Sequence, residues 1–351
     1  MANSRNSASP EPLLQAVVAA LHRHLPQPCP GMRLAAGLSG GRDSVALLFA
    51  LKEVQADFAY TLSACHVHHG LSPHADAWQA HCQALCDRHS IPLQVFRVHV
   101  PPRSREGLEA AARRLRYEAY ARLEADWLML AQHQGDQAET LLFNLLRGSG
   151  VAGARGMPEV RPVREGLRLM RPCLGVGRAD IDRYLKSRNL PWVEDESNED
   201  ERFSRNFLRH RVFPVLQQRF PAAEARLAAT AAHLSEAGEL LDELALADLA
   251  GRIPEFPLPV SVLAGLPEAR GRNLLRYLLG LHRIMIPGAP RLREALRQLC
   301  ESAPDRHPEV AFGQWRLIRV RGEIVLKEGC LQAAAGTREL APTVWTEFPR
   351  R

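Results

Sequence analysis

The segment Ser39-Gly40-Gly41-Arg42-Asp43-Ser44 constrains the fold most strongly, because it lies between an expected buried strand at 33–38 and an expected helix at 45–54. Two adjacent glycines can adopt positive φ angles and bring backbone N–H groups close to an anion, while the two serines add hydroxyl donors. The following helix directs the positive end of its dipole to the same place. The sequence therefore predicts a phosphate-binding loop at the carboxyl end of a strand.

The acid within this loop indicates where chemistry occurs. The loop lacks the Gly-Lys-Ser/Thr ending of a Walker A motif, so no lysine is placed to hold a γ-phosphate. A carboxylate beside bound phosphates is unfavourable unless it holds Mg²⁺ or acts on the reacting group. We therefore expect Asp43 to be a metal ligand or a catalytic group and cleavage to occur at the α-phosphate. The alternative to a phosphate-binding loop is an ordinary Gly-rich turn from strand to helix.

The first half of the chain alternates apolar runs with segments of helical periodicity. Strands are expected at 61–68, 93–100, 127–131 and 167–170, with helices at 76–89, 107–125, 136–146 and 178–189. Such alternation is typical of parallel strands joined by right-handed crossovers, with helices on both faces of the sheet. We predict an α/β fold with a doubly wound parallel sheet, whose ligands lie at the carboxyl ends of the strands.

Composition divides the rest of the chain. A stretch rich in Ala, Leu and Glu at 221–249 predicts one long helix, and prolines mark a new start beyond Gly251. Helices are then expected at 270–281 and 291–300, followed by a hairpin formed by 314–320 and 323–327. We therefore predict a first domain at 1–215, a connecting helix at 216–250, and a smaller, mainly helical domain at 251–351.

The basic residues are almost all arginines: three of the 45 Lys and Arg residues are lysines, and the net charge is +6. Guanidinium groups form bidentate pairs with phosphates, so an arginine excess suits a polyanionic partner. The alternative for each arginine-rich stretch is a solvated helix face. No apolar run approaches the length of a membrane span and the first residues are polar, so we expect a cytoplasmic protein without a membrane partner.

The seven cysteines are scattered. They form no Cys-x-x-Cys pair and no zinc-like cluster, so neither a disulfide framework nor a zinc site is expected. Small buried thiols are the simplest interpretation.

Several motifs together resemble one family. Besides the phosphate loop they are the strand end at 66–70, the helix Glu109 to Tyr117, the segment Ala131 to Thr140, and Asp195 to Asn198 followed by Arg205 to Arg209. In this order they resemble the tRNA(Ile)-lysidine synthetases, a family of PP-loop ATPases. The resemblance is carried by 33–214, whereas the later part of the chain matches in size, helical character and basic charge.

The resemblance implies an ATP-dependent ligation of free L-lysine to C2 of the wobble cytidine of tRNA(Ile) with a CAU anticodon. The cytosine O2 would first attack the α-phosphate of ATP and release pyrophosphate, and the lysine amine would then displace AMP. ATP, Mg²⁺, L-lysine and this tRNA are the implied ligands, with catalysis in 1–215 and tRNA binding in 251–351. The oligomeric state is open, and a homodimer is one possibility.

The resemblance also implies roles for individual residues. Asp136 and Glu139 are three positions apart on an expected helix and share a face, so this pair suits the ammonium of lysine; the alternative for Asp136 is a helix cap. For any single arginine a surface role is the alternative. ATP would contact Ser39, Gly40, Gly41, Arg42, Asp43 and Ser44. The catalytic residues would be Asp43, Arg113, Asp136, Glu139 and Arg205, and tRNA would contact Arg116, Arg205, Arg209, Arg272 and Arg276.

The chain departs from the family pattern in two positions. Gly135 stands where an acid is frequent, and Gln132 where a histidine is frequent. Some members continue into a further C-terminal domain, which we do not expect here. The rival interpretations are a PP-loop tRNA thiolase, which would deliver sulfur to the activated base, a small-molecule amide or amidine synthetase, and an RNA-binding protein without chemistry.

Overall fold

The computed structural model describes most of the chain. The described residues are 11–26, 29–101, 107–194, 196, 200–201, 204–282, 284, 288–303 and 306–329. The motif residues Asp195, Ser197 and Asn198 lie outside these ranges. The chain divides into two compact units, Met1–Gly238 and Glu239–Arg351, which are described separately below.

The first unit is built on a six-stranded sheet with the strand order β3-β2-β1-β4-β6-β5. The four neighbouring pairs that link the first five of these strands are all parallel, as the sequence predicts. The last strand, β5, is antiparallel to β6 and was not predicted. It contains Pro162, which fits an edge strand because one side of such a strand needs no ladder hydrogen bonds. The bounds are β1 Arg33–Gly37, β2 Thr61–His68, β3 Leu93–Arg97, β4 Trp127–Met129, β5 Val160–Arg164 and β6 Leu167–Met170.

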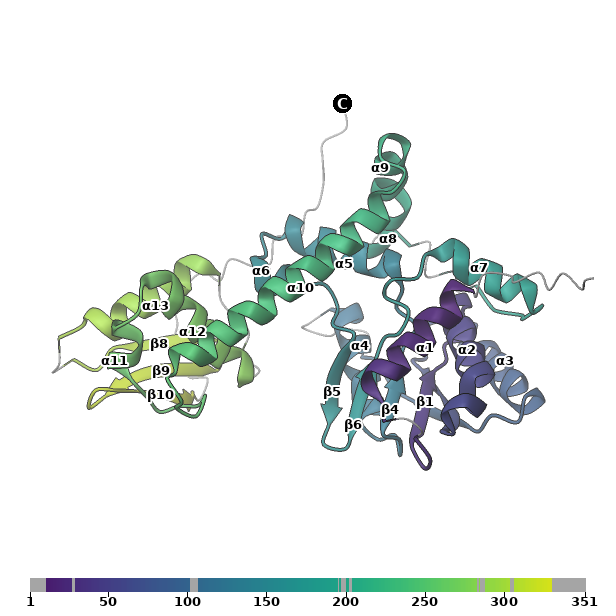
Figure 1. The fold of residues 1–351 in the computed structure, drawn as a ribbon, viewed down its shortest axis with the longest axis horizontal. Helices are drawn as coiled ribbons and strands as arrows, with labels where there is room; N and C mark the ends of the chain where they lie inside the picture. The colour runs from purple at the N-terminus through teal and green to yellow at the C-terminus, as the bar shows by residue number, and fades with distance from the viewer. Residues whose placement is uncertain are drawn as a thin grey trace, which may run out of the picture. The chain divides into compact units, whose positions relative to one another are not determined.

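Helices cover both faces of this sheet (Figure 1). Alternate side chains of a strand point to opposite faces. Accordingly, Trp127 and Met129 join the hydrophobic core formed with α1, α2, α3 and α7, whereas Leu128 and Leu130 pack with α4 on the other side. The doubly wound prediction is confirmed. The bounds are α1 Pro12–His24, α2 Arg42–Phe58, α3 Ala75–Arg88, α4 Leu108–Tyr120, α5 Gln134–Leu146, α6 Val151–Ala154 and α7 Arg178–Ser187.

The segment after the sheet is helical and irregular at one point. The short helix α8 (Ser204–Phe207) runs into a π-helical turn at Leu208–Val212, which continues into α9 (Phe213–Arg219). The long helix α10 (Ala223–Asp248) follows, close to the predicted 221–249. Within it, the absence of a Cβ at Gly238 makes room for the guanidinium of Arg155, whose Nη2 donates to the Gly238 carbonyl at 2.6 Å.

The second unit combines helices with a sheet of its own. The sequence predicted its two longer helices and one hairpin, but two further strands are only two and four residues long and escaped detection. Leu274, Leu278, Leu292 and Leu317 belong to its separate hydrophobic core. Its helices are α11 Val260–Ala264, α12 Glu268–Leu281 and α13 Ala289–Glu301, and its antiparallel strands, in the order β7-β10-β9-β8, are β7 Leu258–Pro259, β8 Glu309–Phe312, β9 Trp315–Val320 and β10 Glu323–Glu328. Within the described ranges, no helix has the length and apolarity needed to cross a membrane.

The separate core of the second unit can be tested on one helix. Leu278 of α12 is fully buried, whereas Leu281 of the same helix is 50% exposed. Replacing Leu278 by Ala should lower the free energy of unfolding by about 3 kcal/mol, because a cavity remains. Urea unfolding followed by circular dichroism measures this loss. Leu281→Ala is the matched control with an expected effect below about 1 kcal/mol, and equal losses would contradict the described core.

Candidate active site

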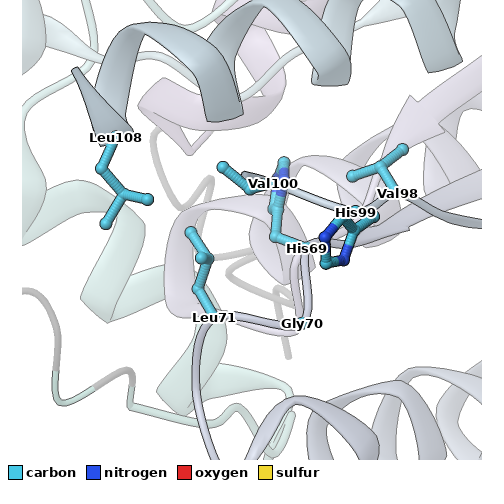
Figure 2. Close-up of a pocket in the computed structure, with 7 residues that line it drawn as sticks. All are labelled: His69, Gly70, Leu71, Val98, His99, Val100 and Leu108. Atoms are coloured by element: carbon cyan, nitrogen blue, oxygen red, sulfur yellow. The ribbon is translucent and has the colours of Figure 1, made fainter. Parts of the chain in front are cut away.

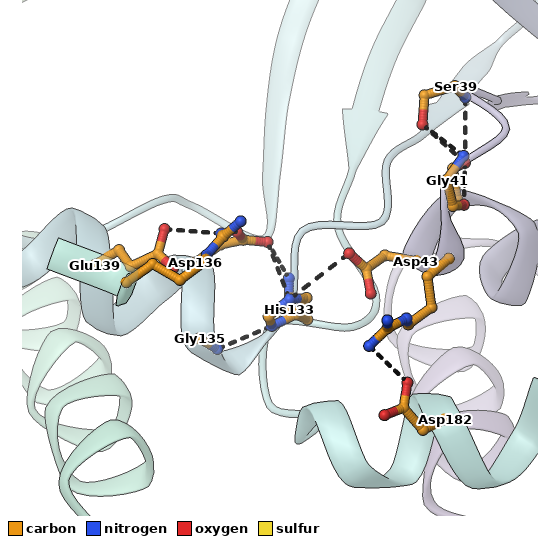
Figure 3. A network of polar contacts seen from close by, with 11 residues as sticks. Ser39, Gly41, Asp43, His133, Gly135, Asp136, Glu139 and Asp182 are labelled. Atoms are coloured by element: carbon orange, nitrogen blue, oxygen red, sulfur yellow. Dashed lines mark hydrogen bonds and ion pairs between the residues drawn. The ribbon is translucent and has the colours of Figure 1, made fainter. Parts of the chain in front are cut away.

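The candidate site lies where β1 and β4 end side by side. These two strands are parallel neighbours, yet the chain leaves β1 toward β2 on one side and reaches β4 only after β3. Such a switch in strand order opens a crevice at the carboxyl ends of the strands. The loop after β1 holds Ser39 to Ser44, and the segment after β4 holds His133 to Glu139 (Figure 3). The fold therefore brings together the two motifs that the sequence singled out.

Hydrogen bonds between residues of the phosphate loop stabilise its conformation. Ser39 Oγ accepts from the Gly41 N–H at 3.2 Å, and Ser44 Oγ donates to the Gly41 carbonyl at 2.8 Å. Gly40 has a φ of 88°, a conformation that L side chains rarely adopt. A Cβ at this position would also lie 3.0 Å from Val193 Cγ2. The glycine is thus required both by backbone conformation and by close packing.

Arg42 contributes to the loop in a different way from its neighbours. Its guanidinium pairs with Asp182 of α7 at 3.0 Å and with Glu194 at 3.2 Å. The side chain is therefore committed to carboxylates of the protein, and it is the backbone of Arg42, at the first turn of α2, that can face a phosphate.

A histidine that sequence analysis left undecided connects the two motifs. His133 is 3% exposed, and its Nε2 lies 3.8 Å from Asp43 Oδ2. The Nδ1 of His133 accepts a hydrogen bond from the Gly135 N–H at 2.9 Å, which requires Nδ1 to be unprotonated. With Nδ1 accepting, the ring N–H is on Nε2, which lies 3.8 Å from Asp43 Oδ2 and also 3.8 Å from Asp136 Oδ2.

The same histidine begins helix α5. His133 is the N-cap residue, and Asp136, three residues on, completes a capping box by accepting from the His133 N–H at 2.9 Å. The sequence alternative of a capping role for Asp136 is therefore partly correct. Gly135 belongs to this arrangement, because a Cβ there would lie 2.8 Å from His133 Cε1. An acid at position 135 is incompatible with this orientation of the imidazole.

The acidic pair on α5 is engaged by Arg209. The Nε and Nη2 of Arg209 donate to the two carboxylate oxygens of Glu139 at 2.6 and 3.0 Å, and Nη2 also donates to Asp136 Oδ1 at 3.1 Å. Glu139 is 4% exposed. Burial raises the pKa of its carboxyl, Asp136 raises it further, and the opposing effect of Arg209 does not cancel the increase. The contact of Arg209 with tRNA stays a prediction.

The π-helical turn explains how Arg209 reaches this pair. The turn at Leu208–Val212 packs on α5, and it places Arg209 between the helical segments α8 and α9. A π-turn inserts one residue relative to an α-helix, and such turns are frequent at functional sites. No sequence signal marked it. Arg205, one turn earlier, donates from Nη2 to Thr140 Oγ1 of α5 at 3.4 Å.

Two further predicted site residues, Arg113 and Arg116, belong to helix α4. Arg116 Nε donates to His69 Nε2 at 3.2 Å, and burial followed by the charge of Arg116 lowers the pKa of His69 to about 4. His69 lines a cavity of about 350 Å³ together with Leu71, Val100 and Leu108 (Figure 2). Arg113 lies 5.6 Å from the centre of the Tyr117 ring.

The remaining predicted tRNA contacts, Arg272 and Arg276, belong to α12 of the second unit. Arg272 forms an ion pair with Glu268 one turn earlier on the same helix.

Thiol chemistry finds little support in the described residues. Burial raises the pKa of Cys65, Cys82 and Cys173 to about 12, so these thiols are protonated near neutral pH. Within the described part of the chain, no group of three or more His, Cys, Asp and Glu side chains is arranged to hold a metal ion. A site for a cluster or persulfide is thus not visible among these residues.

Family comparisons agree with this architecture. A family model described as a PP-loop domain matches residues 14–216, and one described as the TilS substrate binding domain matches 258–325. A relative named tRNA(Ile)-lysidine synthase from Nitrosomonas europaea is 44% identical over 318 residues, covering 90% of this chain and 69% of the relative. The chain belongs to the tRNA(Ile)-lysidine synthase family.

Further members of the tRNA(Ile)-lysidine synthase family give the same result. The relative from Azoarcus is 47% identical and covers 78% of this chain and 61% of its own length, and the one from Chromobacterium violaceum is 40% identical, with 94% and 73% covered. The chain thus spans between 61% and 73% of the lengths of these three relatives. The first unit contains the PP-loop ATP-binding domain of the family.

A solved structure has a fold similar to that of this chain. The U34-tRNA thiolase NcsA from Methanococcus maripaludis, solved with its [4Fe-4S] cluster, matches with a TM-score of 0.51 over 64% of this chain and 78% of its own. Its sequence identity is 15%, which supports the fold alone. Relatives named tRNA(Ile)-lysidine synthase are 40 to 48% identical to this chain, so the thiolase interpretation is not favoured.

The strained loop glycine yields a first test of the site. Gly40→Ala should lower the free energy of unfolding by about 3 kcal/mol, since it adds backbone strain to a close contact. It should also weaken ATP binding, measured by calorimetry. Gly31→Ala is the matched control: Gly31 has a φ of 80° but open space around it, so only strain of about 1 kcal/mol is expected. Equal losses for both variants would contradict the described packing.

Removing the guanidinium from the acidic pair yields a second test. Arg209→Gln leaves the buried Glu139 carboxylate without its cation, so the free energy of unfolding near neutral pH should fall by about 3 kcal/mol. Because Arg209 lowers the pKa of Glu139, its removal raises that pKa further, and the deficit should shrink as the pH falls through the pKa of the variant toward that of the wild type, where the carboxyl is protonated in both folded proteins. Urea unfolding at several pH values measures this dependence.

The control for this variant is Arg211→Gln on the same turn. Arg211 pairs with Glu201 at the surface, where both side chains are exposed. An effect below about 1 kcal/mol with little dependence on pH is expected. A pH-independent loss in Arg209→Gln would show that the guanidinium does not compensate Glu139.

Proposed function

We propose that the protein ligates L-lysine to C2 of the wobble cytidine of tRNA(Ile) bearing a CAU anticodon. In the first step the cytosine O2 attacks the α-phosphate of ATP, forming a P–O bond and releasing pyrophosphate. In the second step an amine of lysine attacks C2, the C2–O2 bond breaks, and AMP leaves with that oxygen while the amine loses a proton. The observation that carries the proposal is an acidic pair, buried at Glu139 and partly buried at Asp136, beside a phosphate loop in a member of the lysidine synthase family.

The ATP end of the site is assigned to the loop after β1. The Ser39 hydroxyl and the first-turn backbone of α2 offer donors to phosphates, while the positive end of the helix dipole favours their charge. Asp43 fits Mg²⁺, because its Oδ1 is buried and has no hydrogen-bond partner among the described residues. Mg²⁺ takes one or two protein carboxylates together with phosphate oxygens. When bound, the ion would neutralise charge that develops on the phosphates.

The lysine end is assigned to Asp136 and Glu139. The two ionised carboxylates and the guanidinium of Arg209 leave a net charge of −1, which one ammonium group would balance. Each ionised carboxylate has lone pairs for more than one donor, so an ammonium can bind without displacing Arg209. The pair is thus matched to a cationic substrate in charge and in acceptor capacity.

Activation of the amine is assigned to the same pair. An ammonium must lose a proton before its nitrogen can attack a carbon. Glu139, whose pKa is raised mainly by burial, is a better proton acceptor than an exposed carboxylate would be. Arg209 holds the carboxylate in place through two hydrogen bonds while it accepts the proton.

Binding of the tRNA is assigned to arginines of both units. Arg113 and Arg116 of α4 and Arg205 beside α5 lie on elements that reach the same sheet edge. Basic residues such as Arg272 and Arg276 of α12 belong to the region matched by the substrate-binding family model. Phosphate contacts of this kind position a nucleic acid without reading its sequence.

A transfer assay tests the proposed reaction. The purified protein is incubated with ATP, labelled lysine and an unmodified tRNA(Ile) transcript with the CAU anticodon. Label should enter the RNA only when all components are present, and a transcript with U in place of the wobble C should stay unlabelled. Transfer to several unrelated tRNAs, or ATP consumption that is indifferent to lysine and RNA, would refute the proposal.

The role of the acidic pair is tested separately. Glu139→Gln should lower kcat/KM for lysine about tenfold or more, since a charged hydrogen bond to the substrate is lost. Pyrophosphate release with ATP and tRNA, without lysine, should persist because the first step does not involve lysine. Glu118→Gln, which removes an exposed acid paired with Arg114, is the control. An unchanged KM for lysine in Glu139→Gln would contradict the assignment of lysine binding to this pair.

A further inference from the structure

Tyr117 lies among guanidinium groups from separate elements. The Cζ of Arg161, on β5, is 4.3 Å from the centre of the Tyr117 ring, and that of Arg113, on α4, is 5.6 Å away. Arg171 directly follows β6 and is 2% exposed. Sequence analysis named Arg113 alone of these three arginines, because Arg161 and Arg171 reach it only through the unpredicted pairing of β5 with β6.

The positive charges of this cluster are not balanced by acids. None of the three arginines forms an ion pair with a carboxylate of the described residues. Arg171 donates to neutral acceptors, Gln132 Oε1 at 3.1 Å and the Pro158 carbonyl at 2.7 Å. The Nε of Arg161 is buried without a hydrogen-bond partner. Of the three, Arg171 is buried, Arg161 is partly buried and Arg113 is exposed. A buried charge without a counter-ion is costly, so an arrangement of this kind suits a bound anion.

The titration behaviour of the cluster agrees with this geometry. Burial lowers the pKa of Arg171, and the charges of Arg161 and Arg113 lower it further. Although burial raises the pKa of Tyr117, the three arginines lower it overall. The positive charges of the neighbouring arginines contribute to both shifts.

The cluster belongs to the sheet edge that carries the active site. Gln132, which accepts from Arg171, immediately precedes His133, whose imidazole faces Asp43. In the strand order, however, β5 is three positions from β1, or about 14 Å at the usual strand spacing. The triphosphate held after β1 therefore does not account for the cluster, whereas a polynucleotide that enters the site can extend this far.

We propose that Arg113, Arg161 and Arg171 bind a backbone phosphate of the tRNA next to the reacting nucleotide, with Tyr117 holding two of the guanidinium groups in place. This site rests on the proposed function. Three planar guanidinium groups can offer bidentate hydrogen bonds to one phosphate, and arginine is suited to this geometry. The phosphate fixes the position of the RNA strand relative to the ATP loop.

The test compares two single-charge variants of the same hairpin. Arg161→Gln removes a charge from the cluster, and Arg168→Gln removes one from exposed Arg168, which stacks on Trp127. In Arg161→Gln, affinity for the tRNA transcript should fall about tenfold, and the slope of log affinity against log salt should decrease by about one. Arg168→Gln should change the affinity less. Circular dichroism checks folding, and Arg171→Lys, which keeps the charge but loses the bidentate geometry, is the second variant if Arg161→Gln does not fold.

The possible outcomes separate the sources of phosphate. ATP affinity, measured without RNA, should be unchanged in Arg161→Gln, and a loss of ATP affinity with unchanged tRNA binding would overturn the assignment to tRNA. Equal tRNA binding by Arg161→Gln and Arg168→Gln would also overturn it. If the wild-type protein transfers lysine in that case, only this site fails. A wild-type protein that neither binds tRNA nor transfers lysine refutes the proposed function as well.

Discussion

The candidate site depends on one buried imidazole that serves both sides of the switch in strand order. His133 caps helix α5 through Nδ1 and its backbone N–H, and it presents Nε2 to Asp43 of the phosphate loop. Capping fixes the tautomer, and the tautomer decides that a donor faces the carboxylate. The orientation of the acidic pair on α5 and that of the loop after β1 are thus set relative to the same ring.

Local signals in the sequence predicted the frame of this site. The glycines of the loop, the alternation of strands and helices, and the spacing of Asp136 and Glu139 all depend on residues that are close in the chain. The partners of these residues could not be predicted in the same way. Arg209 meets Glu139 across 70 residues because of a π-turn, and Arg171 meets Gln132 across 39. Such contacts depend on packing, which periodicity does not encode.

The two departures from the family pattern have structural explanations. Gly135 makes room for the His133 ring, and Gln132 supplies a neutral acceptor to Arg171. Asp43 lies beside His133 and Glu139 pairs with Arg209, whereas Arg161 lies beside Tyr117. One edge of the sheet thus offers opposite charges to a cationic and an anionic ligand, and the low dielectric constant of the partly buried edge strengthens both attractions.

The π-turn also bears on how this site can change by insertion or deletion. Each residue of a regular helix advances the side-chain direction by about 100°. Loss of a single residue from Leu208–Val212 would restore α-helical winding and rotate Arg209 away from α5, although no residue of the acidic pair had changed. Glu139 would then be buried without its cation. Helix register in this segment is therefore as important to the ionisation of the pair as the identity of the acids themselves.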